Sequence, residues 1–333
     1  MPLPRSALLV VLAACAFTSS AAAAGAASAE PALRTPPATL RAAVTCPPAV
    51  RDGAREPVLL VHGTGDTGRA TWAGTVDVQG VLARAGHPAC VVELPRFALA
   101  DVQDSAEYVV SAIRAASRLA DRPIAVYGYS QGGLLARWAL TFWPSLRPLV
   151  ADVVSVAGPQ HGTTYGDSAE VIAALCSPAA GCPPAYWQQG VDAHLIAALG
   201  RRPDETPGST AWTTVRSADD DLVQPETGPR PTSSLAGATN VLIQATCPGR
   251  QVSHEDIKYD SVSYAALLDA ITHAGPARTR RFPRDVCAAL HAPGLTDVAV
   301  AAHATTAEAT ATARTLAYTP QATAEPPLRA YAR

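Results

Sequence analysis

Residues 123–143 read PIAVYGYSQGGLLARWALTFW, and this stretch decides the fold. The apolar run at 123–127 is typical of a buried strand, and the residues from 134 to 143 are typical of a buried helix. Between them lies GYSQG at 128–132, a G-x-S-x-G pentapeptide at a strand-to-helix junction. So tight a turn holds its serine in a strained backbone conformation and favours glycine wherever a Cβ would crowd the neighbouring strand and helix. The context therefore predicts that Ser130 is a nucleophile.

The sequence on either side of this turn predicts the rest of the sheet. Short apolar runs indicate further strands at 57–61, 90–94, 150–157, 213–217 and 241–247. Apolar residues at helical spacing predict a helix over 101–120, capped by Asp101 or Asp104, and another over 263–273. Strands separated by helices indicate an α/β fold, with a mostly parallel central sheet and helices on both faces. A chain of 333 residues suits one large domain of this kind.

No strand is expected between 164 and 208. Insertions of this kind build the walls of the active site in α/β enzymes, so we expect a small cap at about 165–208. Residues 30–45 are rich in Ala and Pro and predict an extended arm. Residues 291–333 form an Ala/Thr/Pro-rich C-terminal extension. For this extension two interpretations stay open: a helix over the mouth of the site, or a poorly ordered tail.

The first 29 residues have the pattern of a secretion signal. A short basic region at 1–5 precedes an apolar core at 7–17, and Ala27-Ser28-Ala29 forms a small-residue cleavage site. The apolar core is too short for a convincing membrane span. We therefore expect a secreted protein. The alternative is a lipid anchor on the cell surface, because residues 12–15 resemble a bacterial lipoprotein box that ends at Cys15.

Seven cysteines divide into Cys15 in the signal and six in the remaining chain. An even number in an oxidising compartment implies three disulfides among about 15 formal connectivities. Cys176 and Cys182 are close in sequence, so a local bridge is the simplest pairing. Zinc ligation is not expected, because the paired C-x-x-C spacing is missing. The six cysteines are Cys46, Cys90, Cys176, Cys182, Cys247 and Cys287.

A formal net charge of −2 gives no electrostatic argument for a nucleic-acid partner. Lys258 is the only lysine among many arginines. We attribute this to a high-GC coding bias and give it no role in the chemistry.

A serine hydroxyl is a weak nucleophile, so it needs a neutral imidazole within reach and a carboxylate that orients the imidazole. The acid is expected just after the strand at 213–217, where three aspartates stand at 219–221. One of them is the acid and the other two are solvated; the alternative is an ordinary acidic turn. The best-placed base is His254, seven residues after the last strand in a polar loop before a helix. His291 and His303 also follow the acid, whereas His273 lies near a helix end, where a structural or dipole contact is favoured.

The tetrahedral intermediate needs hydrogen-bond donors for its oxyanion. One is the backbone N–H of Gln131, next to the nucleophile and at the positive end of the following helix. A second is expected in the loop after residues 57–61, which reads His62-Gly63-Thr64-Gly65. Its glycines allow close approach to a substrate, and Thr64 adds a hydroxyl. The alternatives are an ordinary glycine turn and, for His62, a packed structural histidine, which we favour.

Four stretches, 61–68, 129–134, 140–145 and 222–225, resemble the fungal lipase B family of α/β-hydrolases. The resemblance covers roughly residues 46–290 and implies the α/β-hydrolase fold with a small cap. It also implies that Ser130 is the nucleophile, Asp220 the acid and His254 the base. Asp220 is selected because it stands four residues before Gln224, as in that family. Thr64 and Gln131 become the oxyanion donors.

The same resemblance implies disulfides Cys46–Cys90 and Cys247–Cys287, which leaves Cys176–Cys182 as a local addition. The chain departs from the fungal pattern at Gly128, which completes the elbow consensus, and at Tyr129, where the family has tryptophan. Residues 165–190 are built differently, and residues 159–163 are closer to bacterial secreted lipases.

We therefore expect a secreted bacterial lipase or esterase that hydrolyses acylglycerol-like carboxylic esters through an acyl-enzyme. It is expected to need no metal or organic cofactor, and to act as a monomer on a lipid or ester substrate, including at a lipid–water interface. An apolar lining would favour an acyl chain over a charged group. The alternatives are a cell-envelope acyltransferase of the same fold and an inactive binding protein, against which the complete triad argues. The candidate pocket residues are Tyr129, Thr163, Gln189, Leu222 and Val223.

Overall fold

The computed structural model describes Met1 and residues 30–333 of the chain. The expected signal segment and the alternative lipidation site at Cys15 lie outside the described residues.

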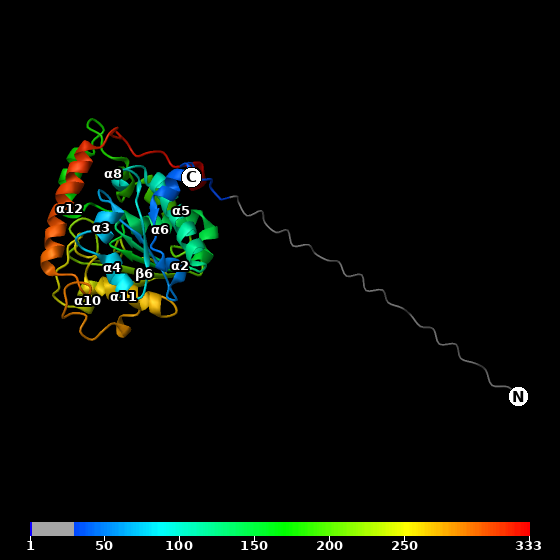
Figure 1. The fold of residues 1–333 in the computed structure, drawn as a ribbon. Coiled ribbons are helices and arrows are strands. Elements are labelled where there is room, and N and C mark those ends of the chain that lie inside the picture. Colours follow the sequence, from blue (N-terminus) through cyan, green and yellow to red (C-terminus); the bar gives the residue numbers. More distant parts are fainter. Residues whose placement is uncertain (2–29) are drawn as a thin grey trace.

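A seven-stranded sheet forms the centre of the molecule, with strand order β1-β3-β2-β4-β5-β6-β7 (Figure 1). β1 pairs antiparallel with β3, and every other neighbouring pair is parallel. This arrangement confirms the predicted mostly parallel sheet. The strands are β1 Val44–Thr45, β2 Val58–Val61, β3 Ala89–Val92, β4 Ile124–Tyr129, β5 Val150–Val156, β6 Ala211–Arg216 and β7 Thr239–Leu242.

Helices follow most of the strands, as parallel crossovers require. The α-helices are α1 Pro37–Ala42, α2 Ala49–Asp52, α3 Gly68–Ala73, α4 Val78–Arg84, α5 Val102–Ala120, α6 Gln131–Phe142, α7 Ala169–Leu175, α8 Pro184–Gln189, α9 His194–Gly200, α10 Ile243–Thr246, α11 Ser261–Thr272 and α12 Asp297–Ala317. Short 3₁₀ helices lie at η1 Pro95–Ala98, η2 Pro144–Leu149, η3 Gly166–Ser168, η4 Thr279–Arg281 and η5 Ala330–Ala332.

The continuous apolar strands are explained by burial on both faces. Side chains alternate along a strand, so Leu59 and Val61 of β2 pack in one core with α5 and α6. Val58 and Leu60 point to the opposite face and pack in a second core with α3, α4 and α11. Because all four side chains are buried, β2 needs no polar alternation. The helices therefore cover both faces of the sheet, as predicted.

Two boundary predictions were wrong. Residues 30–45 are not an extended arm throughout, because α1 forms within them. Pro37 opens α1, where its fixed φ suits the first helical position, and the buried side chain of Leu40 anchors the helix. The strand predicted at 241–247 ends at Leu242, and α10 begins at Ile243. A short apolar run has the same pattern in a strand and in a buried helix, so periodicity alone does not separate them.

The C-terminal extension forms a helix, and the chain end after it packs against the rest of the domain. Thr296 caps α12, which lies along one side of the molecule and is orange to red in Figure 1. The chain end returns to α5, where Arg329 pairs with Asp104 and Glu107. The ring of Tyr331 meets two aromatic rings of α6 and the ring of Trp143 at centroid distances of 5.2 to 6.3 Å. Residues 297–317 are therefore a helix and not a poorly ordered tail.

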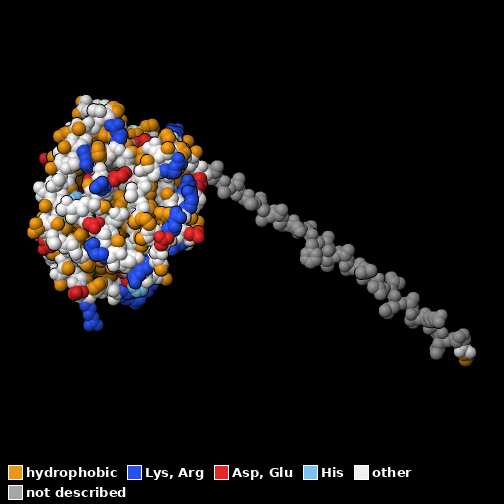
Figure 2. Space-filling view, in the orientation of Figure 1, with side chains coloured by type: hydrophobic (Ala, Val, Ile, Leu, Met, Phe, Trp, Pro, Cys, Tyr) orange, Lys and Arg blue, Asp and Glu red, His pale blue; other side chains and the backbone are white. Residues whose placement is uncertain are grey.

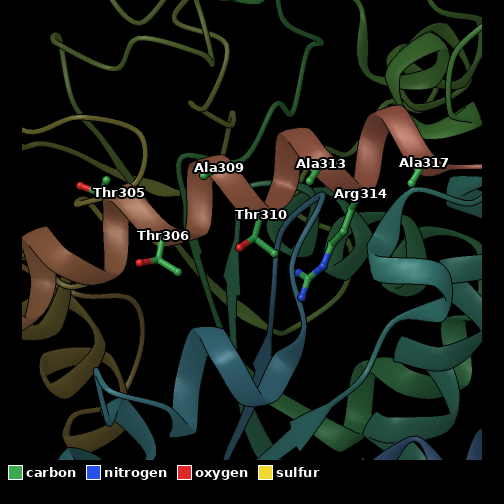
Figure 3. A pocket seen from close by; sticks show the side chains of 7 residues that line it. All are labelled: Thr305, Thr306, Ala309, Thr310, Ala313, Arg314 and Ala317. Carbon is green, nitrogen blue, oxygen red and sulfur yellow. The ribbon is translucent and has the colours of Figure 1, made fainter.

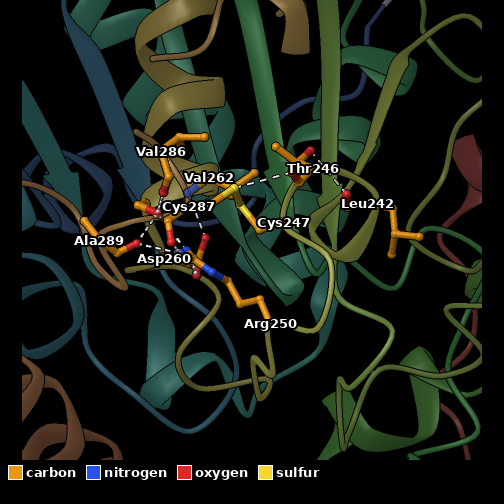
Figure 4. The surroundings of a disulfide bond; sticks show 10 residues. Leu242, Thr246, Cys247, Arg250, Asp260, Val262, Val286, Cys287 and Ala289 are labelled. Atoms are coloured by element: carbon orange, nitrogen blue, oxygen red, sulfur yellow. Dashed lines mark hydrogen bonds and ion pairs between the residues drawn. A yellow bond between two sulfur atoms is a disulfide. The ribbon is translucent and has the colours of Figure 1, made fainter. Parts of the chain in front are cut away.

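Three disulfides form, with the pairing named above: Cys46–Cys90, Cys176–Cys182 and Cys247–Cys287. Arg250 supports the last of these (Figure 4). Its guanidinium donates to the backbone carbonyl of Cys287 at 2.8 Å and to that of Ala289 at 2.6 Å. It also pairs with Asp260 at 3.0 Å. The disulfide and the arginine together fix the segment after η4 beside the start of α11.

The molecular surface is mixed in charge. In Figure 2, acidic and basic side chains are interspersed on the visible face, in keeping with the near-neutral net charge of the sequence. Among the described residues, no helix has the length and apolar character needed to span a membrane.

Candidate active site

The turn between β4 and α6 has the strained geometry that the pentapeptide predicts. Ser130 has φ 53° and ψ −125°, and its backbone N–H donates to Val156 at 2.8 Å. A Cβ on Gly128 would lie 2.6 Å from the backbone of Gly132. A Cβ on Gly132 would lie 2.4 Å from the carbonyl oxygen of Val61 in β2. Both glycines are therefore required by close backbone approach.

The three predicted triad residues meet above the carboxyl ends of the strands. The Nε2 atom of His254 lies 3.0 Å from the Oγ atom of Ser130. Its Nδ1 atom lies 2.9 Å from Oδ2 and 3.1 Å from Oδ1 of Asp220. The network assigns the Nδ1 proton to the carboxylate side and leaves Nε2 as acceptor for the serine hydroxyl. All three residues are at least nine-tenths buried, with 6%, 5% and 2% exposure for Ser130, His254 and Asp220.

The environment of His254 sets its protonation behaviour. Burial by itself lowers the pKa of the imidazole, but the charge of Asp220 and its hydrogen bond to Nδ1 outweigh burial, so the pKa is raised. The Asp220 carboxylate is itself held by the protein. Its Oδ1 atom accepts the backbone N–H groups of Leu222 at 3.0 Å and Val223 at 2.7 Å. Asp220 is therefore held so that it can orient the ring and stabilise an imidazolium.

The two neighbouring aspartates are exposed, as expected, but both make contacts. Asp221 accepts the backbone N–H of His254 at 2.8 Å, and Asp219 accepts from the side chain of Gln244 at 3.1 Å. The side chain of Gln224, whose spacing selected Asp220, donates to the Asp220 carbonyl. Only Asp220 reaches the imidazole of His254.

The loop after β2 presents a hydroxyl beside the start of α6. Thr64 Oγ1 accepts from Gln131 Nε2 at 2.9 Å and from Gln189 Nε2 at 3.1 Å. A hydroxyl has two acceptor positions and one proton, so these two bonds leave its O–H as the remaining donor. The arrangement can therefore offer the Thr64 hydroxyl, together with the N–H groups of the loop and of the first turn of α6, to a developing oxyanion.

His62 is a packed histidine that shapes this loop. It is completely buried, which lowers its pKa and keeps the ring neutral. Nδ1 donates to the carbonyl of Gly63 at 2.8 Å, and Nε2 accepts the N–H of Leu94 at 3.0 Å. The ring thus ties the loop after β2 to the end of β3.

A left-handed run in η1, which no sequence pattern announces because it contains no glycine, also supports the loop. Arg96, Phe97 and Ala98 have φ values of 51°, 63° and 57°. The Phe97 carbonyl accepts the N–H of Gly65 at 2.8 Å, and the Ala98 carbonyl accepts from Gln131 Nε2 at 2.9 Å. Three successive strained non-glycine residues persist only where their surroundings over-determine them. Here two of their carbonyls hold the loop after β2 and the side chain of Gln131.

The candidate pocket residues lie around the same loops. Thr163 donates to the carbonyl of Leu222 at 2.7 Å and accepts the N–H of Gln224 at 3.1 Å, so it holds the loop that contains the acid. Val223 is buried and Leu222 is half-buried. Gln189 reaches Thr64, as described above, and Tyr129 stacks at 5.1 Å from the ring of His254. The structure therefore brings these residues close to the triad or to the loops that hold it.

Helix α12 lies against residues 62–66 of the loop after β2, called the oxyanion loop below for its proposed role. Arg314 points from α12 toward this loop (Figure 3), donating to the carbonyl of Gly65 at 2.8 Å and pairing with Asp66 at 3.1 Å. Its guanidinium also lies 4.3 Å from the ring centre of Phe97. A shallow, open depression of about 670 Å³ lies along this side of α12, and none of the predicted site residues lines it. Its lining residues are Thr305, Thr306, Ala309, Thr310, Ala313, Arg314 and Ala317.

Within the part of the chain that the structure describes, no group of three or more His, Cys, Asp or Glu side chains is placed to hold a metal ion.

The chain is similar to known lipases in both sequence and structure. A model of the palmitoyl protein thioesterase family matches residues 57–199. Lipase B of Pseudozyma antarctica is 32% identical over 330 residues, covering 97% of this chain and 92% of the fungal protein. The crystal structure of Aspergillus fumigatus lipase B superposes with a TM-score of 0.83 at 29% identity, covering 92% of this chain and 74% of that one. A Bacillus licheniformis lipase in its propeptide form shares the fold, with a TM-score of 0.51 at 18% identity over 68% of this chain and 52% of that chain.

Proposed function

Because the chain belongs to the lipase B family of α/β-hydrolases and is a carboxylic ester hydrolase, we propose that it cleaves acylglycerol-like esters through Ser130, Asp220 and His254 by way of an acyl-enzyme. The observation that carries this proposal is the continuous hydrogen-bond chain from Asp220 through His254 to Ser130.

Acylation begins when His254 Nε2 removes the proton of Ser130 as Oγ attacks the ester carbonyl carbon. The carbonyl oxygen becomes an oxyanion, which receives hydrogen bonds from the N–H of Gln131 and from the N–H and O–H of Thr64. Asp220 stabilises the imidazolium. As the intermediate collapses, His254 gives its proton to the departing alkoxide, and the alcohol leaves behind a Ser130 ester.

Deacylation repeats these steps with water as the nucleophile. His254 takes a proton from the water as its oxygen attacks the acyl carbon, and then returns that proton to Ser130 Oγ. The free acid leaves, and the resting site is restored. No step requires a metal or an organic cofactor.

We further propose how the remaining parts serve this chemistry. Residues 46–290 form the catalytic domain, 165–208 its cap and 291–333 an extension that braces the oxyanion loop through Arg314. Tyr129, Thr163, Gln189, Leu222 and Val223 form or support the substrate pocket. Three disulfides fit an oxidising, extracellular compartment, which supports release from the cell after removal of residues 1–29, with an anchor at Cys15 as the alternative.

The proposal is tested with purified protein and p-nitrophenyl esters of graded acyl chain length. We expect hydrolysis that persists in a chelator and rises with chain length beyond acetate. A long-chain acyl thioester belongs in the same assay, because of the match to the palmitoyl protein thioesterase family. Adding an alcohol acceptor distinguishes a hydrolase from the alternative acyltransferase. A transferase would pass the acyl group to the alcohol faster than water hydrolyses the ester. Absence of turnover with every ester would contradict the proposal.

The cap gives a second prediction. Cys176 and Cys182 are only 6 residues apart, against 44 and 40 for the other pairs, so their bridge restricts the unfolded chain least. We expect its removal to cost about 2 kcal/mol in the free energy of unfolding, against about 4 kcal/mol for a longer loop. The backbone bonds between Cys182 and Ala322, at 2.9 and 2.8 Å, remain after substitution. Replacing both cysteines by serine should therefore lower Tm only slightly. The larger effect should be on the rate of hydrolysis of esters with long acyl chains.

Thermal unfolding and relative rates on short and long esters measure the two effects. The matched control replaces Cys46 and Cys90 by serine and should lower Tm further. If the cap variant unfolds at ordinary temperature, or if peptide mapping pairs Cys176 with a distant cysteine, this prediction is wrong.

A further inference from the structure

The single lysine of the chain is buried against Tyr129, whose ring packs on the ring of the proposed base. The side chain of Lys258 is 1% exposed, and its ammonium pairs with the carboxylate of Glu255. It also donates to the Glu255 carbonyl at 2.6 Å. Its Nζ atom lies 4.2 Å from the ring centre of Tyr129 and 4.7 Å from that of Tyr259. An ammonium removed from water is costly unless it is paired, and this one faces one carboxylate and two aromatic rings.

The same cluster contacts the backbone of the base. The Tyr129 hydroxyl lies 3.0 Å from the His254 carbonyl oxygen and 3.0 Å from Oε1 of Glu255. A phenol has one proton, so these two acceptors share it. Tyr129 immediately precedes Ser130 at the end of β4. The contact therefore sets the distance between the segment that holds the base and the strand that holds the nucleophile. A tryptophan, the family's residue here, has no hydroxyl to make it.

We propose that Tyr129, Glu255 and Lys258 form a positioning cluster for His254, in which Tyr129 holds the backbone and the opposite charges of Glu255 and Lys258 offset each other at the imidazole. This inference rests on the proposed role of His254 as general base. None of the three residues touches the reacting atoms, so they act through His254.

Charged and titratable groups surround His254. Asp220 faces Nδ1, and Asp221 accepts the backbone N–H. Glu255 and Lys258 both contact Tyr129; the charge of Glu255 raises the pKa of His254 and that of Lys258 lowers it. From α12, His303 contacts the hydroxyl of Tyr259 at 3.0 Å. Burial, followed by the charge of Lys258, lowers the pKa of His303, so this histidine is neutral at pH 7.

Glu255 is ionised in this arrangement. Burial raises its pKa, but the charge of Lys258 and the hydrogen bond from its ammonium outweigh burial, and the net pKa is lowered. Its side chain is 31% exposed, which keeps the carboxylate partly solvated even without the lysine. Removing Lys258 should therefore leave the charge of Glu255 acting on His254 unopposed. Removing the Glu255 charge leaves an ammonium that keeps the backbone carbonyl of residue 255 and two aromatic rings as partners, so its charge should act on His254 unopposed.

The test compares Glu255→Gln, Lys258→Met and the double variant, which remove charge with little change in side-chain size. A general base must be neutral, so kcat/KM falls on the acid side as His254 becomes protonated. Glu255→Gln removes a charge that favours imidazolium, so the acid limb should move to lower pH. Lys258→Met removes a charge that disfavours it, so the limb should move to higher pH. We expect each shift to be about half a pH unit or more, and the double variant to lie close to the wild type.

A readout without turnover separates this inference from the proposed function. In a Ser130→Ala background, NMR titration of ¹⁵N-labelled His254 should show the same two opposite shifts, whether or not the wild type hydrolyses esters. The matched control is Asp269→Asn, which removes a buried carboxylate that pairs with Arg281 away from His254 and should leave the titration unchanged.

Opposite shifts that cancel in the double variant support the cluster. Shifts in one direction, or lower kcat with an unmoved acid limb and titration, would show a merely structural role and overturn the inference. If circular dichroism shows that Lys258→Met alone does not fold, Glu255→Gln and the double variant still test the inference. In that case the His254 pKa should fall in Glu255→Gln and return toward the wild-type value in the double variant. A purely structural role would not produce that reversal.

Discussion

Ser130→Ala is expected to reduce kcat for ester hydrolysis by on the order of 10⁶ while leaving the protein folded. The hydroxyl is the proposed covalent centre, and no other hydroxyl has been found within hydrogen-bond distance of His254 Nε2 in the described structure. The substitution removes one oxygen and one hydrogen bond. It leaves the strained backbone of residue 130, the glycines around it and the N–H bond to Val156 in place. Kinetics with a short p-nitrophenyl ester measure the loss.

A fluorophosphonate probe gives an independent measurement on the same pair of proteins. The wild type should be labelled at Ser130, and the variant should not be labelled. The far-ultraviolet circular dichroism and Tm of the two proteins serve as the folding control. Labelling at another serine, or substantial activity in Ser130→Ala, would refute the assignment of the nucleophile.

Features with a local cause could be predicted from the sequence. The glycines at 128 and 132 are needed because backbone approaches backbone within a few residues of the nucleophile. The pentapeptide therefore predicts the geometry of this turn. The strands are continuous apolar runs because both faces of the sheet are covered. The choice of Asp220 among three aspartates needed more than local pattern, and the spacing to Gln224 supplied it.

Features that depend on distant contacts could not be predicted. Gln189 reaches Thr64 across 125 residues of chain, so the double acceptance at the Thr64 hydroxyl appears only after the cap has folded. The left-handed run at 96–98 contains no glycine and therefore has no sequence signature. Lys258 is the only lysine in the sequence, but composition does not show whether a charge is buried. Its burial against Tyr129, next to His254, depends on the fold and could not be predicted.

These distant contacts converge on two small groups, the Thr64 hydroxyl and the His254 ring. Thr64 is held by side chains from α6 and the cap, and its loop by η1, β3 and α12. His254 is held by the loop after β6 on one side and by Tyr129 on the other. Preorganised donors and a fixed base need no reorganisation during the reaction, which is the physical reason for so many supporting contacts.

Asp220→Asn is expected to lower kcat by about 10⁴, because it should move the imidazole proton of His254 from Nδ1 to Nε2. The Oδ1 atom of Asp220 accepts two backbone N–H groups, from Leu222 and Val223, so the oxygen of an asparagine amide should occupy that place. Its NH₂ group then faces His254 Nδ1 from the position of Oδ2, 2.9 Å away. An N–H donor there turns Nδ1 into an acceptor and moves the ring proton to Nε2. The ring then has no lone pair for the proton of Ser130.

The neighbouring aspartates provide the matched controls, measured by the same kinetics. Asp219→Asn removes only an exposed contact with Gln244 and should be mild. Asp221→Asn weakens the acceptor for the His254 N–H and should cost at most about tenfold, since the carbonyl of the amide can still accept that bond. NMR should also find the pKa of His254 lowered in Asp220→Asn, because the charge that opposes burial is lost. If Asp219→Asn is instead the crippling change, the acid lies one residue earlier and the geometry that assigns the tautomer is wrong.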